Sequence, residues 1–197
     1  MEISVLLFDD AELLDWAGPT QVFQSASRYA PVTLNIRYYG YGSERISSGG
    51  LRYYCNGLWE HAYEGKDHIV LLPGGTGVQR LFTDKTKRIV TGFFEAGAKL
   101  ASVCTGSLLL AYSGLLSGKN ATTHHENFDE LARLAPDCHI QRDVRYTGRS
   151  PVYTAAGISA GIDLALALVA WQWSLDVAHR TAAFIEYPTD GIQQYEF

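Results

Sequence analysis

The sequence is poor in cysteine, and its cysteines do not form a recognisable pattern. Only Cys55, Cys104 and Cys138 occur among 197 residues, an odd number at unrelated spacings. Disulfide-stabilised folds need paired cysteines, and zinc sites built on cysteine need them at short, regular spacings. We therefore expect reduced thiols and no cysteine-based metal site.

Positive charge is also scarce. The 16 Lys and Arg residues are outnumbered by 21 Asp and Glu residues, which gives a net charge of −5. The basic residues are scattered along the chain, whereas proteins that bind nucleic acids concentrate Lys and Arg on one face. We therefore expect no nucleic-acid partner.

Long apolar runs are missing as well. A membrane-spanning helix needs roughly 18 to 20 apolar residues, and the longest run here, 158–173, is interrupted by Gly161 and Asp163. The N-terminus enters a strand-like pattern at once, without the basic region and cleavage site of a secretory signal. We expect a cytoplasmic protein with no membrane partner.

Strand-length apolar runs alternate with helix-length segments, which is typical of an α/β fold whose parallel sheet is covered on both faces. With no internal repeat or linker, residues 1–197 are expected to form a single domain. The expected strands are 3–8, 32–39, 68–72, the run before Cys104, and short strands within 138–155 that turn at Gly148, with a hairpin in 40–57. The expected helices are 13–16, 19–29 with Pro19 at its first position, 78–82, 87–96, 105–113, 126–134, 158–175 and 176–185.

Three unusual segments follow the expected strands. Asp15 lies after the first strand, Gly74 and Gly75 lie after 68–72, and Cys104 lies after the next strand. Ligands of open parallel sheets bind beyond the carboxyl ends of the strands, so we expect these residues to converge. Taken singly, Asp15 is typical of a helix cap, the glycines of a turn, and Cys104 of a small buried residue.

The cysteine stands between an apolar run and a small-residue turn, in the sequence KLASVCTGS at 99–107. A sharp strand-to-helix corner exposes such a side chain, as in a nucleophile elbow, and the helix N-terminus stabilises a thiolate relative to a thiol. The backbone amides of Gly74, Gly75 and Thr105 are candidate donors to an oxyanion, because glycine has no side chain to block the approach. The pattern indicates Cys104 as a nucleophile.

Five motifs together carry a family resemblance. They are LDWAGP at 14–19, LPGG at 72–75, SVCTG at 102–106, ATTH at 121–124 and AGISAGID at 156–163. In this order and spacing they resemble the ThiJ/PfpI superfamily, which has a class I glutamine amidotransferase-like fold. The resemblance implies a flavodoxin-like three-layer α/β/α sandwich with a mostly parallel central sheet, a cysteine at the elbow, and a homodimer.

Activities differ within this superfamily, and single residues separate its branches. Members similar to peptidases pair the cysteine with a histidine directly after it or in a late His-Pro-Glu motif, whereas Thr105 follows Cys104 here. Without a close imidazole base, amide hydrolysis is disfavoured. Glyoxalase-like and deglycase-like members usually carry Glu at the position of Asp15. Asp15, with CTG at 104–106 and TTH at 122–124, is similar to the isonitrile-hydrating members.

That resemblance implies a small-molecule substrate and a reaction without a metal or organic cofactor. The Cys104 thiolate attacks the terminal carbon of an isonitrile to give a thioimidate, and water then releases an N-substituted formamide. Asp15 is the expected proton donor and later activates water, since burial beside a thiolate raises the pKa of a carboxyl group. The Thr105 hydroxyl is expected to orient the carboxyl group or the water.

Other functions stay open. Similar sequences form the ligand-sensing domains of AraC-type regulators, where a helix-turn-helix domain follows; none is expected here because the sequence ends at Phe197. The alternatives are a small-molecule-binding module without turnover, a redox or stress sensor in which a low-pKa Cys104 is oxidised, and a glyoxalase-like or deglycase-like enzyme.

Two adjacent histidines and a tryptophan complete the candidate site. His124 and His125 suggest a metal site, but neighbours in sequence rarely place both imidazoles on one tetrahedral ion, so no metal is expected. The resemblance places His124 near the cysteine, where it lines the pocket or holds a solvent molecule; capping the helix that begins near Glu126 is the alternative. We expect His125 at the surface, and Trp16 either shapes the substrate pocket or packs in the core.

Overall fold

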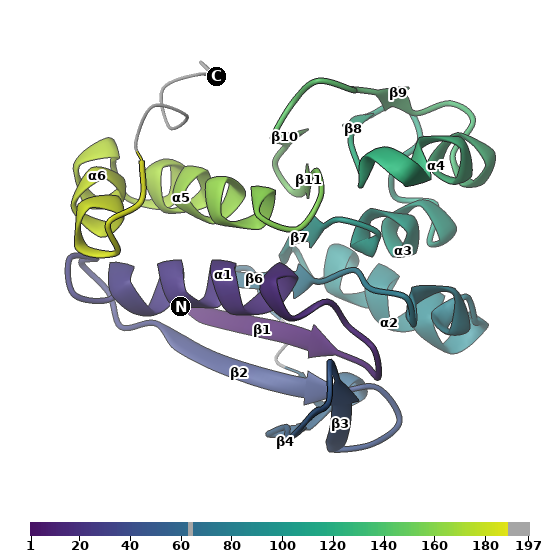
Figure 1. Ribbon diagram of the computed structural model, residues 1–197, viewed down its shortest axis with the longest axis horizontal. Coiled ribbons are helices and arrows are strands. Elements are labelled where there is room, and N and C mark those ends of the chain that lie inside the picture. The colour runs from purple at the N-terminus through teal and green to yellow at the C-terminus, as the bar shows by residue number, and fades with distance from the viewer. Residues whose placement is uncertain (63–64, 189–197) are drawn as a thin grey trace.

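A seven-stranded sheet forms the centre of the protein, whose computed structural model describes residues 1–62 and 65–188. The strand order is β10-β11-β7-β6-β1-β2-β5 (Figure 1). Neighbouring strands are parallel except for β10 and β11, which form an antiparallel hairpin. The expected α/β fold with a mostly parallel sheet is confirmed. The strands are β1 Glu2–Leu7, β2 Asn35–Gly40, β5 Gly57–Leu58, β6 His68–Leu72, β7 Lys99–Val103, β10 Tyr146–Arg149 and β11 Val152–Ala155.

Helices cover both faces of this sheet and create two separate cores. The helices are α1 Leu13–Ala26, α2 Asp84–Glu95, α3 Gly106–Tyr112, α4 Phe128–Leu134, α5 Ala160–Gln172 and α6 Leu175–Phe184. Helices α1, α5 and α6 pack together on one face, and α2, α3 and α4 pack on the other (Figure 1). In β1, Ile3 and Val5 enter the first core and Leu6 enters the second. A strand buried on both faces is therefore nearly continuously apolar.

Within the described residues, no helix combines the length and apolar character needed to cross a membrane.

Shorter elements surround the sheet. The hairpin expected within 40–57 is present, the expected helix 78–82 is a single 3₁₀ turn, and the expected helix 126–134 is divided into a 3₁₀ turn and α4. These elements are the hairpin strands β3 Arg45–Ser48 and β4 Leu51–Tyr54, the paired strands β8 Asn120–Ala121 and β9 His139–Ile140, and the 3₁₀ turns η1 Trp59–His61, η2 Val78–Leu81 and η3 His125–Asn127.

Helix α1 runs through a proline. The sequence predicts two pieces with Pro19 at the start of the second, but α1 is continuous and Pro19 lies inside it. A proline inside a helix removes a backbone hydrogen bond and costs about 3 kcal/mol. Pro19 is buried against Gly161 of α5, where a Cβ atom would lie 3.0 Å from the proline ring. Packing of α1 on α5 thus overrides the local preference.

Two other predicted boundaries are wrong for related reasons. Helix α5 begins at Ala160 because Ile158 has a φ of 42°, which a right-handed helix excludes. The predicted turn at Gly148 lies instead at 150–151, between β10 and β11. Gly148 is needed inside β10, because its φ is 128° and a Cβ atom would lie 2.5 Å from the Val152 carbonyl oxygen.

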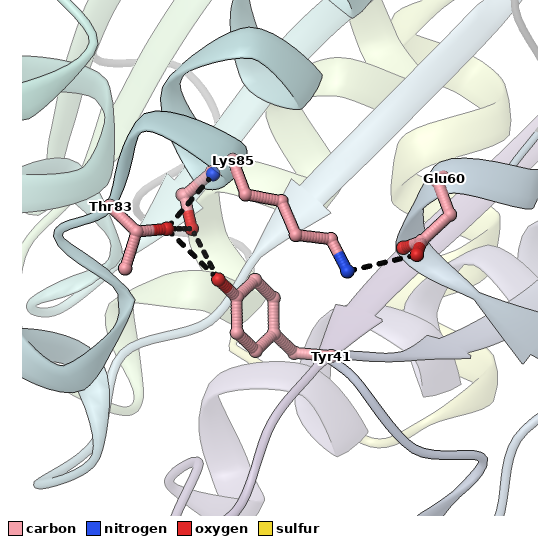
Figure 2. A network of polar contacts seen from close by, with 5 residues as sticks. Tyr41, Glu60, Thr83 and Lys85 are labelled. Atoms are coloured by element: carbon pink, nitrogen blue, oxygen red, sulfur yellow. Dashed lines mark hydrogen bonds and ion pairs between the residues drawn. The ribbon is translucent and has the colours of Figure 1, made fainter.

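Polar contacts attach the start of α2 to the segment after β2 (Figure 2). Thr83, the N-cap of α2, accepts a hydrogen bond from the Thr86 N–H at 3.2 Å, and its hydroxyl lies 3.0 Å from the Tyr41 hydroxyl. Lys85 donates to Glu60 of η1 at 2.9 Å. The cap contributes about 1 kcal/mol, whereas the partly exposed ion pair contributes less. The network joins segments that are far apart in the sequence.

A leucine of β7 tests how much stability the buried sheet supplies. Leu100 has 0% exposure, so Leu100→Ala leaves a cavity and is expected to lower the free energy of unfolding by about 2–5 kcal/mol. Leu51→Ala is the matched control, because Leu51 is 53% exposed on β4 and its loss is expected to cost less than about 1 kcal/mol. Urea unfolding followed by circular dichroism measures both, and equal losses would contradict the packing.

Candidate active site

Three neighbouring strands, β1, β6 and β7, end at the candidate residues. Asp15 lies in the first turn of α1 after β1, Gly74 follows β6, and Cys104 follows β7. The Gly74 N–H donates to Oδ2 of Asp15 at 2.8 Å, and Asp15 and Cys104 affect each other's pKa. The structure therefore brings the three segments together at one edge of the sheet, where parallel sheets bind ligands.

Cys104 occupies the sharp corner between β7 and α3. Its φ of 55° is in the left-handed region, which costs about 1–3 kcal/mol for a residue with a side chain. Hydrogen bonds to its backbone hold this corner: the Cys104 N–H donates to the Ala156 carbonyl at 2.9 Å, and the Thr123 hydroxyl donates to the Cys104 carbonyl at 3.0 Å. Gly106 permits the close approach, since a Cβ atom there would lie 2.1 Å from the Leu72 carbonyl oxygen. The corner has the geometry of an elbow, but Cys104 is only 7% exposed.

Asp15 is fully buried and does not cap α1, because Glu12 occupies the N-cap position. Its Oδ2 is bound by Gly74, while Oδ1 has no partner within hydrogen-bond geometry among the described residues. Burial raises the pKa of Asp15 from 3.8 to about 7. The Gly74 N–H lowers this pKa, the charge of Glu12 raises it, and the neighbouring Cys104 lowers it, each by less than burial does. Asp15 therefore gains or loses its proton near neutral pH.

The Cys104 thiol favours its neutral form. Burial, followed by the negative charge of Asp15, raises the pKa of Cys104 from 9.0 to about 12. The N–H groups of Thr105 and Ile158 and the Thr105 hydroxyl lower it by smaller amounts. The backbone at the start of α3 thus acts in the direction that the sequence predicts, but burial outweighs it. The net shift is opposite to the predicted one.

The N–H groups of Gly74 and Gly75, expected as oxyanion donors, are bound to side chains of the protein in this structure. The Gly74 N–H is used by Asp15, and the Gly75 N–H donates to Oγ1 of Thr105 at 2.9 Å. A Cβ atom at Gly74 would lie 2.5 Å from the Thr105 nitrogen and 2.9 Å from Oδ2 of Asp15. The loop packs directly on both side chains, and a role of the glycines as oxyanion donors stays a prediction. The glycines position Asp15 and Thr105.

Ile158 is a site residue that the sequence did not reveal. Its φ of 42° is an outlier for a β-branched residue, and its N–H acts on the Cys104 thiol. Its side chain is 37% exposed. The AGISAGID motif includes this position, but only the pairing of β11 with β7 brings it to Cys104.

A pocket of about 510 Å³ opens beside Ile158, and the buried thiol and carboxyl group are not among its lining residues. His124 lines this pocket and packs against Gly157, where a Cβ atom would lie 2.5 Å from Cδ2 of the imidazole. Its Nδ1 also accepts a hydrogen bond from the Glu126 N–H at 3.4 Å, so His124 caps η3 as well. His125 is exposed, as expected. The described residues contain no group of three or more His, Cys, Asp and Glu side chains that could hold a metal ion.

Trp16 belongs to an aromatic cluster with one tyrosine of β2 and one of the β3–β4 hairpin. Its ring centroid lies 5.4 Å from that of Tyr53 and 5.8 Å from that of Tyr38. Its Nε1–H is buried without a hydrogen-bond partner in the described part of the chain. These contacts hold the Trp16 ring against Tyr38 and Tyr53, and a role of Trp16 in shaping a substrate pocket stays a prediction.

Comparisons with known proteins agree with this fold. The DJ-1/PfpI family matches residues 1–171. Isonitrile hydratase of Pseudomonas putida is 32% identical over 197 residues, covering 95% of this chain and 78% of that protein. The HTH-type transcriptional regulator CdhR of Pseudomonas aeruginosa is 29% identical over 129 residues, covering 66% of this chain and 38% of the regulator. The crystal structure of a ThiJ/PfpI family protein from Pseudomonas syringae matches with a TM-score of 0.84 at 25% identity, covering 96% of this chain and 76% of that one. The chain belongs to the DJ-1/PfpI family.

Proposed function

We propose that the protein adds water to an isonitrile and releases an N-substituted formamide, with Cys104 as nucleophile and Asp15 as acid and base. The observation that carries this proposal is the buried Asp15 carboxyl group beside the Cys104 thiol. A pKa of about 7 lets Asp15 both accept and donate a proton at neutral pH. The similarity to isonitrile hydratase of Pseudomonas putida supports the substrate class.

In the first half of the reaction, Asp15 accepts the proton of the Cys104 thiol, and the sulfur bonds to the terminal carbon of the isonitrile. The lone pair left on that carbon accepts the proton from Asp15. The product is a thioimidate, R–N=CH–S–Cys, formed without net oxidation or reduction. The proton thus moves from sulfur to carbon through one carboxyl group.

In the second half, water attacks the thioimidate carbon. Asp15 accepts a proton from the attacking water and passes it to the nitrogen. Collapse of the tetrahedral intermediate breaks the carbon–sulfur bond, and the hydroxyl proton returns to the sulfur through Asp15. The released product is R–NH–CHO, and the free thiol is regenerated.

The backbone around the pair stabilises the charged forms that this cycle needs. The N–H groups of Thr105 and Ile158 favour the Cys104 thiolate, and the Gly74 N–H favours the Asp15 carboxylate. These fixed dipoles need no rearrangement when charge moves between sulfur and carboxyl oxygen. They support a thiolate that forms during the reaction, although the resting group is a thiol.

A small-molecule-binding module without turnover is the second candidate. It is favoured by the similarity to the regulator CdhR and by the small exposure of Cys104, which is 7%. Calorimetry that shows saturable binding of an alkyl isonitrile, with no formamide formed, would favour the module over the enzyme. A redox sensor has less support, because burial lowers the fraction of reactive thiolate.

Substitution of the reacting pair tests the enzyme directly. Cys104→Ala is expected to abolish formamide production from cyclohexyl isocyanide, because no nucleophile remains. Asp15→Asn is expected to lower kcat/KM by about 10²–10⁴-fold, the usual contribution of general acid and base catalysis. Proton NMR of the formamide measures both. Cys138→Ala, at a free cysteine outside the site, is the control and should match the wild type. Undiminished turnover by Cys104→Ala would refute the mechanism.

The pH profile reports the protonation of the pair. Below about pH 7, Asp15 is protonated and cannot take the thiol proton; above it, the pair holds one proton until the thiol ionises at about 12. We therefore expect kcat/KM to rise through about pH 7. Asp15→Asn should lose this dependence. A wild-type profile that falls through the same range would show that the doubly protonated pair is the reactive form.

The buried carboxyl group should also cost stability. Its pKa is higher in the folded chain, so the folded state binds the proton more tightly, and stability falls as pH rises from about 4 to about 7. The difference between 3.8 and about 7 corresponds to at most about 4 kcal/mol. Asp15→Asn should therefore be more stable than the wild type in urea at about pH 8, and this gain should vanish near about pH 4. Asp176→Asn, whose side chain is 75% exposed, is the control without such a gain. A constant difference at both pH values would contradict this account.

A further inference from the structure

The segment 156–159, between β11 and α5, breaks two local preferences of the chain. Ile158 is β-branched yet has a positive φ of 42°. Ser159 is the N-cap of α5, but its side chain makes no cap hydrogen bond, although serine at this position normally does. Such conformations persist only where tertiary contacts hold them, and they concentrate at functional sites.

Arg145, which directly precedes β10 and lines the pocket, makes these contacts. Its Nη2 donates to the Ser159 hydroxyl at 3.0 Å, which explains why that hydroxyl does not cap α5. Its Nε and Nη2 donate to Oδ2 of Asp163 at 2.9 and 2.6 Å. The Arg145 carbonyl accepts a hydrogen bond from the Ala156 N–H at 2.9 Å. One residue thus holds both ends of the segment.

The other side of the segment faces Cys104. The Ala156 carbonyl accepts the hydrogen bond of the Cys104 N–H at 2.9 Å, and the Ile158 N–H lowers the pKa of the thiol. The segment therefore connects Arg145 to the backbone of Cys104. Any shift of the segment changes the donors around the Cys104 sulfur.

We propose that Arg145 is a positioning residue for Cys104. With Asp163 it holds the 156–159 segment, and with it the Ala156 carbonyl and the Ile158 N–H, in place at Cys104. The inference rests on the proposed function only for its effect on turnover. Its effect on the thiol itself does not depend on the substrate.

The charges of Arg145 and Asp163 could also act directly on the Cys104 thiol, and this effect differs from their hold on the 156–159 segment. Asp163 is also bound by the Tyr187 hydroxyl at 3.1 Å, and Asp15 is the charged group that acts on Cys104; His124 and Asp143 line the pocket beside Arg145. Removing the negative charge of Asp163 would by itself favour a nearby thiolate. Releasing the segment would disfavour it, because a donor to the thiolate is lost. The two effects have opposite signs in Asp163→Asn.

The test is the rate of alkylation of Cys104 by iodoacetamide, a neutral reagent, as a function of pH. Peptide mass spectrometry separates Cys104 from Cys55 and Cys138. We expect Asp163→Asn and Arg145→Met each to raise the pKa of the thiol by about 1, which lowers the rate at a fixed pH about tenfold. An unchanged or faster reaction in Asp163→Asn would overturn the proposal.

The exposed ion pair between Arg133 and Glu130, at 2.6 Å on α4, provides the matched control. Arg133→Met should leave the alkylation profile unchanged, and an equal slowing there would also overturn the proposal. If Asp163→Asn does not fold, Ser159→Ala decides: slower alkylation supports positioning, and a wild-type profile refutes it. Formamide production is measured in parallel. A wild type without turnover would refute the proposed function, while the alkylation result still decides the role of Arg145.

Discussion

The site depends on the burial of two acidic groups side by side. Removing Asp15 and Cys104 from water raises both pKa values, because a low-polarity surrounding disfavours each charged form. The chain compensates with backbone donors: Gly74 for the carboxylate, and Thr105 and Ile158 for the thiolate. Because these donors come from segments after β6, β7 and β11, they reach the pair only when these strands are assembled.

Close backbone approach is the second requirement, and it explains where small and strained residues occur. No side chain fits at Gly74, between Asp15 and Thr105, or at Gly106, against the Leu72 carbonyl. Cys104 and Ile158 adopt positive φ angles that only their surroundings maintain. The protein thus carries local strain and a buried ionisable pair at its candidate active site, and both lower its stability.

The sequence predicted the architecture well because burial on both faces leaves a clear signal. The apolar runs of β1 and β6 and the small-residue corner at Cys104 indicated a parallel sheet and the edge where Asp15 and Cys104 meet. The sequence-based predictions were wrong where contacts between distant segments determine the local structure. Pro19 lies inside α1, for example, because α5 packs on it. The N–H groups of Gly74 and Gly75 donate to side chains of the protein. The Ile158 N–H lies near Cys104 only because β11 pairs with β7.

The sequence by itself determined the fold class, through the periodicity of its apolar runs, and the identity of the two acidic groups, through the residue types at the ends of strands. The family resemblance rested on five sequence motifs. Only the tertiary structure decided the protonation states of Asp15 and Cys104. Whether the Cys104 thiol is reactive at rest depends on how much water burial removes and on which N–H groups point at the sulfur. The start of α3 favours the thiolate, as the local sequence suggests, but burial and the charge of Asp15 reverse the outcome, because desolvation is set by the packing of the whole chain.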